Sequence, residues 1–180
     1  MLKKTIIALS ASFLIALSPV YAETEVEGNV AFPVIESSYS PNFAPSLVGG
    51  SITPTEGDSY SLVGVEISLD CPLFQPSGGN VRQQFSYAVF SKDDVSGTLI
   101  EINPHWMNNL SENVTIGFGP GLGLATVEAT DGESTSYFEV GAGVSLSVKA
   151  GSILFGADWR QMSAGDFDNS RGIVKAGYSF

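Results

Sequence analysis

The sequence predicts an all-β fold, a single antiparallel transmembrane β-barrel with eight strands. Apolar and polar residues alternate with a period of two through most of the chain, and the last alternating run ends in an aromatic residue. No run is long and apolar enough for a membrane-spanning helix, which needs about 20 residues. Alternate side chains of a barrel strand face lipid and lumen, so this alternation is the pattern that a membrane-spanning strand requires.

Residues 1–22 predict a cleaved signal peptide. Lys3 and Lys4 precede an uncharged apolar run, and small residues lead up to Ala22, where a signal peptidase would cleave. Residues 23–180, 158 residues in all, are then expected to form one outer-membrane-type barrel domain. At about 9 to 11 residues for each strand, this length holds eight strands and their loops but not a porin-sized barrel.

Seven segments show the alternation, and every second residue in each is expected to face lipid. In chain order these outward residues are Val63, Val65, Ile67 and Leu69 in 60–71; Phe85, Tyr87 and Val89 in 82–90; Ile100, Ile102, Pro104 and Trp106 in 100–107; Ile116, Phe118, Pro120, Leu122 and Leu124 in 115–127; Phe138, Val140, Ala142, Val144, Leu146 and Val148 in 137–149; Ile153, Phe155, Ala157 and Trp159 in 152–162; and Val174, Ala176, Tyr178 and Phe180 in 170–180.

The first strand is the least clearly marked. Residues 29–36 are preferred because apolar residues alternate there, although Pro33 cannot donate to a ladder and favours a short or irregular strand. Residues 46–52 are the competing segment. The preferred choice makes 37–58 one long loop rich in Pro, Gly and Ser.

The remaining connections fall into two groups, short turns on the side of the two termini and loops on the other side. The turns are expected at 108–113 and 150–151, and the loops at 91–96, 128–136 and 163–170. The connection at 72–80 is longer than a turn on its side should be, and the sequence offers no explanation for it.

The inward positions carry nearly balanced charge. They are the acids Glu66, Asp70, Glu101, Glu139 and Asp158, the bases Arg82, Lys149, Arg160, Arg171 and Lys175, and His105. Without Lys3 and Lys4 the chain has 6 basic and 19 acidic residues, a net charge of −13, so its bases lie almost exclusively inside. Side chains fill the interior of an eight-stranded barrel, and charges there must be paired or solvated. We therefore expect a salt-bridged, mostly occluded lumen; a conducting pore is the alternative.

The strand pattern and the terminal Tyr178, Ser179 and Phe180 resemble the small eight-stranded Gram-negative barrels grouped with the OmpA membrane domain, OmpX and OmpW. The resemblance implies location in the outer membrane, contact with its lipids, delivery by periplasmic chaperones, and a barrel-assembly machinery that reads Tyr178 and Phe180. It also implies a monomer. The segments 69–73 and 101–106 look like marks of a subfamily of unknown activity. Members of the wider class are anchors, adhesins, pores or lipid-modifying enzymes, so the resemblance does not choose among these roles.

The interpretation preferred here is a non-enzymatic structural or surface-interaction role without catalytic, cofactor or metal-binding residues. The alternatives are a narrow solute channel and a lipid-modifying enzyme in which His105, with Glu101 nearby, acts as an acid–base pair. The glycines from Gly117 to Gly123 are spaced by two with no following helix, which excludes a nucleotide loop; they are expected to make room for inward charges.

The loops are acidic, and this charge balance gives no support to nucleic-acid binding. Their charged residues are Glu56, Asp58, Asp93, Asp94, Glu128, Asp131, Glu133, Asp166 and Asp168, against Lys92. Mutual repulsion and solubility are the expected consequence. Divalent cations shared with a phosphorylated lipid surface are the alternative, with Asp166, Asp168 and Asn169 as the tightest cluster. Cys71 is single and excludes an intramolecular disulfide.

Overall fold

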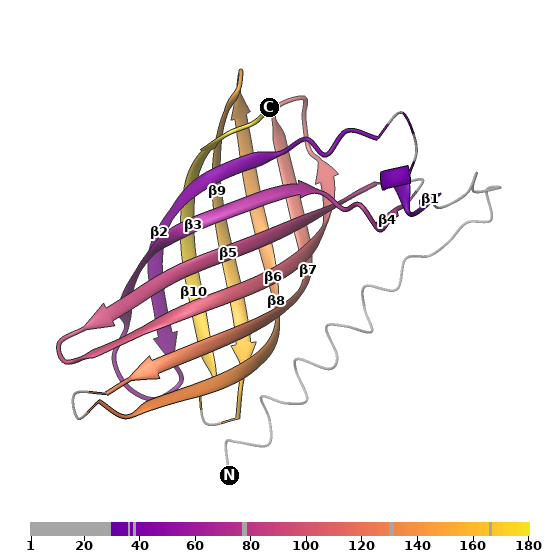
Figure 1. Ribbon diagram of the computed structural model, residues 1–180. Coiled ribbons are helices and arrows are strands. Elements are labelled where there is room, and N and C mark those ends of the chain that lie inside the picture. The colour runs from indigo at the N-terminus through magenta and orange to yellow at the C-terminus, as the bar shows by residue number, and fades with distance from the viewer. Residues whose placement is uncertain (1–29, 36, 38, 77–78, 130–131, 166) are drawn as a thin grey trace, which may run out of the picture.

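The computed structural model describes residues 30–35, 37, 39–76, 79–129, 132–165 and 167–180. They form a closed antiparallel barrel of eight strands in the order β10-β2-β3-β5-β6-β7-β8-β9, which confirms the predicted fold class (Figure 1). The barrel strands are β2 Ala44–Pro54, β3 Tyr60–Asp70, β5 Asn80–Lys92, β6 Val95–Asn109, β7 Val114–Glu128, β8 Ser134–Ala150, β9 Ile153–Ser163 and β10 Asn169–Tyr178. No helix within the described ranges is long and apolar enough to cross a membrane. The predicted signal peptide lies outside the described residues.

The barrel has two distinct ends. The turn end holds the start of β2, the connections 71–79, 110–113 and 151–152, and the end of β10. The loop end holds the connections 55–59, 93–94, 129–133 and 164–168. β10 closes the barrel by pairing with β2 on one side, through Arg171 and Ile52, and with β9 on the other, through Arg171 and Arg160.

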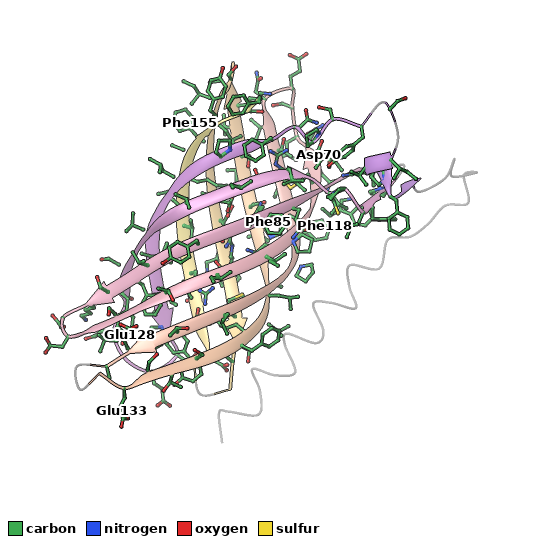
Figure 2. The ribbon with its side chains drawn as sticks, viewed as in Figure 1. Asp70, Phe85, Phe118, Glu128, Glu133 and Phe155 are labelled. Atoms are coloured by element: carbon green, nitrogen blue, oxygen red, sulfur yellow. The ribbon has the colours of Figure 1, made fainter. Side chains whose placement is uncertain are left out.

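The outer wall is apolar, as the alternation predicts. Val144 and Leu146 are exposed on β8 while Ser145 between them is buried, and the same parity holds along the other six predicted segments. Figure 2 shows Phe85, Phe118 and Phe155 projecting away from the barrel. A closed wall covered by exposed Leu, Ile, Val and Phe side chains fits hydrocarbon and not water. The barrel is therefore built to span a membrane.

The predicted first strand is wrong, and the competing segment is the correct one. The first barrel strand is β2, whereas β1 (Val30–Ala31) pairs with β4 (Phe74–Gln75) in a two-stranded sheet outside the barrel. The expected loop 37–58 accordingly contains β2, and only 55–59 connects β2 to β3. The alternation did not mark β2 as a barrel strand, because its apolar residues Val48 and Ile52 face the lumen and its outer face includes glycine and serine.

The long connection between β3 and β5 is ordered by β4. Gln75 donates through Nε2 to the carbonyls of Cys71, at 3.1 Å, and Val81, at 2.9 Å, and its Oε1 accepts from the Val81 amide at 2.9 Å. These bonds fold the connection into a compact turn. The edge of β4 in this turn pairs with β1. The length that looked anomalous in the sequence is the length needed to build β4.

The ladder between β6 and β7 is interrupted at mid-strand. Ile102 pairs with Leu122 and Trp106 with Phe118, so the register places Pro104 directly opposite Pro120. No pair is formed from residue 103 to residue 105, because neither proline has an N–H to donate. The β6–β7 ladder therefore consists of two separate pieces.

Candidate functional site: the lumen

The lumen contains three layers along the barrel axis, and the layer nearest the loop end is apolar. We call it the apolar plug; it consists of Val48, Ile52, Leu62, Ala88, Phe90, Leu99, Ala125 and Ile173. Tyr60, Val127, Tyr137 and Phe167 pack against it. Phe167, from the β9–β10 connection, stacks on Tyr137 with ring centroids 5.3 Å apart and on Phe90 at 6.5 Å. This layer is a departure from the polar, salt-bridged interior that the inward residues predict.

The middle layer is a network of buried ion pairs, which we call the central network. Its members are Glu66, Glu101, Glu139, Asp158, Arg160, Arg171 and Lys175, and all are buried. Arg160 lies at its centre and bonds to three carboxylates: Glu101 at 2.8 Å, Glu66 at 3.2 Å and Asp158 at 2.7 Å. These acids come from β3, β6 and β9, so Arg160 ties together strands on different sides of the lumen.

Arg171 extends the network toward β8. Its guanidinium bonds to Glu101 at 2.5 Å and also to Glu139, and its Nε donates to Asn169 at 2.9 Å. Asn169 in turn donates to Glu139 at 2.7 Å. Every carboxylate around Arg171 therefore has a cationic or amide donor, which offsets the cost of removing charge from water.

Lys175 closes the network on the side of the turn end. Its Nζ donates to Glu66 at 2.8 Å and to Asp158 at 3.1 Å. Since Arg160 bonds to the same two carboxylates, both acids bridge two cations. The network alternates four acids with three bases, so neighbouring groups attract one another throughout.

The layer at the turn end is an open polar vestibule of about 650 Å³. Asp70 and Arg82 form an ion pair on its wall at 3.2 Å, and Asn80 donates to Asp70 at 2.8 Å. Asp70 is labelled in Figure 2 near the point where β3 leaves the barrel. Lys149 also lines the vestibule but is exposed. The structure thus separates Asp70, Arg82 and Lys149 from the central network, although all three were expected among the paired charges of an occluded lumen.

His105 does not form the pair with Glu101 that the enzyme alternative requires. The Glu101 carboxylate faces Arg160 and Arg171, and His105 contacts Ser145, with 3.0 Å between Nδ1 and Oγ. His105 and Ser145 are 0% and 2% exposed. Ser145 lies 40 residues away on β8, beyond the reach of any local sequence signal. The two side chains form a hydrogen-bonded pair enclosed by the wall.

Inward glycines make room for these polar side chains. A Cβ on Gly121 would lie 2.5 Å from Asn103 Oδ1, and one on Gly123 would lie 3.0 Å from Glu139 Oε2. On β8, a Cβ on Gly143 would lie 3.0 Å from Arg160 Cγ. Within the series from Gly117 to Gly123, only Gly123 makes room for charged side chains as expected; Gly117 faces Met107 and Ser145, and Gly119 faces the backbone of β6.

The described residues contain no group of three His, Cys, Asp or Glu side chains that could hold a metal ion. Cys71 is buried with a free thiol.

At the loop end, Lys92 and Asp58 form an exposed ion pair at 2.6 Å, and this hydrogen bond holds the pKa of Asp58 below its usual value. Asp131 and Asp166 lie outside the described residues. Of the other two residues named for the divalent-cation alternative, Asp168 accepts hydrogen bonds from Ser163 and Ala164, and Asn169 is buried beside Glu139.

Both residues of the predicted assembly signal lie at the turn end, where their side chains are exposed. Phe180 contacts Tyr178 with ring centroids 4.9 Å apart and Phe43 at 6.1 Å. Its amide donates to the Phe43 carbonyl at 3.0 Å, which holds the chain end beside the start of β2. Recognition of these two residues by an assembly machinery stays a prediction.

Comparison with known proteins identifies the fold. No family model matches the sequence, and no curated protein matches it. The N-terminal barrel domain of Pseudomonas aeruginosa OprF is similar in structure with a TM-score of 0.58 and 13% identity, over 79% of this chain and 100% of that one. Ail, the attachment invasion locus protein of Yersinia pestis, gives 0.57 and 15% over 77% and 96%, and Neisserial surface protein A gives 0.51 and 15% over the same shares. The chain therefore has the fold of the small outer-membrane β-barrels, in agreement with its resemblance to OmpA, OmpX and OmpW.

Proposed function

We propose that this chain is an integral outer-membrane barrel that neither conducts solutes nor catalyses a reaction, and that its role is structural or lies in contacts of its outer loops. The single observation that supports this is the order of layers in the lumen. A solute entering the vestibule would meet the central network, whose charges are bonded to one another, and beyond it the apolar plug. Passage would require breaking buried ion pairs and then crossing a layer that does not solvate charge.

The alternative of a narrow channel is tested by recording from the full mature chain in planar bilayers. Wild type is expected to give no stable, ion-selective conductance. Phe90→Ala is the matched control: it removes the centre of the apolar plug and keeps every ion pair of the central network, so it should remain closed as well. Reproducible ion-selective channels from wild type would overturn the occluded-lumen proposal.

The enzyme alternative depends on the His105–Ser145 pair, the one arrangement here that resembles a base beside a nucleophile. Its burial on both sides opposes this role, because a catalytic pair has to touch its substrate. We expect the phospholipids and lipid A of cells producing wild type, His105→Gln or Ser145→Ala to be identical by mass spectrometry. A lipid modification that appears with wild type and is lost in both variants would replace this proposal with an enzymatic one.

The loops favour contact with cationic or neutral partners over anionic ones. Glu56, Asp58 and Asp93 outnumber Lys92, the single base in the loop sequences, and acids in the other loops add to the negative field. Ail has been solved in complex with the heparin analogue sucrose octasulfate, and we propose that this chain does not share that kind of ligand. It should pass through heparin resin at low salt without retention, whereas a variant with Asp93→Lys and Asp94→Lys should be retained longer. Strong retention of wild type would refute this electrostatic reasoning.

A further inference from the structure

Five large apolar side chains form an exposed cluster outside the barrel at its turn end. We call it the apolar shelf; it consists of Phe32, Val34, Ile35, Leu73 and Phe74, with exposed fractions of 57%, 52%, 83%, 62% and 38%. Three come from the turn that follows β1 and two from the connection that builds β4. Contiguous exposed apolar side chains are costly in water and mark a surface that contacts something apolar.

The shelf is held in place by backbone bonds. The amide of Phe32 donates to the Leu73 carbonyl at 2.9 Å, and the amide of Val34 donates to the Pro72 carbonyl at 3.3 Å. Ile35 donates back to Phe32 at 3.2 Å and closes a short 3₁₀ turn. The five side chains are therefore presented by a defined structure anchored to the barrel wall between β3 and β5.

The backbone at Phe32 adds a second indication. Its φ is 58°, in the left-handed region that residues other than glycine rarely adopt. Such conformations persist when surrounding contacts compensate for the cost. The backbone bonds of Phe32 to Leu73 and Ile35 hold this conformation, and the side chain that it presents is more than half exposed.

We propose that the apolar shelf inserts into the interfacial zone of the bilayer that surrounds the barrel, where phospholipid headgroups meet acyl chains at the turn end. The inference rests on the proposed membrane location. Figures 1 and 2 show β1 and β4 standing to the side of the ring of strands, and β4 lies in the chain between β3 and β5, the strand that carries Phe85 on its outer face. Lipid covers that wall, and the same lipid reaches the shelf. Apolar side chains inserted to this depth anchor a segment in proportion to their buried area.

The test places a single tryptophan on the shelf of the full mature chain, refolded into phosphatidylcholine vesicles with brominated acyl chains. The shelf probe is Ile35→Trp with Trp106→Phe and Trp159→Phe. The matched control is Ser111→Trp in the same background, in an exposed polar turn at the same end. A third protein, Trp159→Phe, keeps Trp106 and reports insertion of the barrel wall. Mobility on unheated gels verifies that each variant is folded.

The shelf tryptophan is expected to be quenched by bromine as strongly as Trp106 and shielded from aqueous acrylamide, while the control shows the reverse. If Ile35→Trp behaves like Ser111→Trp while Trp106 is quenched by bromine, the shelf proposal is wrong and the membrane location stands. Absence of bromine quenching at Trp106 would contradict both. Shielding that disappears when the protein is diluted with lipid would indicate a second copy as the partner and would also overturn the shelf proposal.

Discussion

Arg160→Met is the sharpest test of the central network. Methionine keeps most of the volume of the side chain but removes the charge that bonds to Glu66, Glu101 and Asp158. Only Arg171 and Lys175 would then remain to pair with the four buried carboxylates of the central network. Removing one partner of a buried pair costs roughly 3 to 5 kcal/mol, because the charges left behind cannot be resolvated. We expect the free energy of unfolding to fall by about that amount.

Equilibrium unfolding by urea in phospholipid vesicles, followed by tryptophan fluorescence, measures this change. Lys92→Met is the matched control, because it also removes a base from an ion pair, but the pair with Asp58 is exposed and screened by water, so its loss should change the free energy of unfolding far less. Combining Arg160→Met with Glu101→Gln should recover part of the loss, with a coupling of roughly 1 kcal/mol or more, since the two residues are in contact. Equal effects of Arg160→Met and Lys92→Met, or no recovery in the double variant, would refute the view that pairing holds these charges.

Two further changes test the wall. Val144→Arg, on the lipid face, should destabilise the barrel by about 2 to 4 kcal/mol in vesicle unfolding titrations; Ser145→Arg should act through crowding near His105 and respond differently to salt, and identical behaviour would contradict the assigned parity. Gly119→Ala places a Cβ 2.0 Å from the Pro104 carbonyl oxygen and should cost about 1 to 3 kcal/mol in the same titration. Gly172→Ala meets nothing within 4 Å and should be neutral, so equal costs for the two glycine changes would invalidate the close-approach argument.

The alternation of apolar and polar residues predicted seven of the eight barrel strands, because the cause of this alternation lies within each strand. On β8, each outward Val or Leu lies next to an inward Gly, Ser or Glu, and lipid on one side with polar groups on the other enforces that parity. On β2 this rule fails. Val48 and Ile52 belong to the apolar plug, so both faces of the strand near the loop end are apolar or small, and alternation no longer marks which side is which.

The candidate site was predictable in composition but not in arrangement. Parity places Glu101, Arg160 and Arg171 inside, yet which acid meets which base depends on barrel closure and strand tilt. Arg171 and Glu101 are 70 residues apart in the chain. The role of Ser145 as partner of His105, and the position of Lys149 in an exposed vestibule, follow from the same three-dimensional register. No property of an isolated segment contains that information.

The two opposed prolines have a mechanical consequence. Beyond Pro104 and Pro120, β6 and β7 remain joined by only four pairs, from Trp106 with Phe118 to Asn109 with Thr115. On their other sides both strands stay paired without a break, β6 with β5 and β7 with β8. Because Met107, Asn108 and Asn109 line the vestibule, the interrupted ladder borders the vestibule. The wall beside the vestibule therefore has fewer backbone bonds between β6 and β7 than an unbroken ladder would supply, while the neighbouring ladders keep both strands in place.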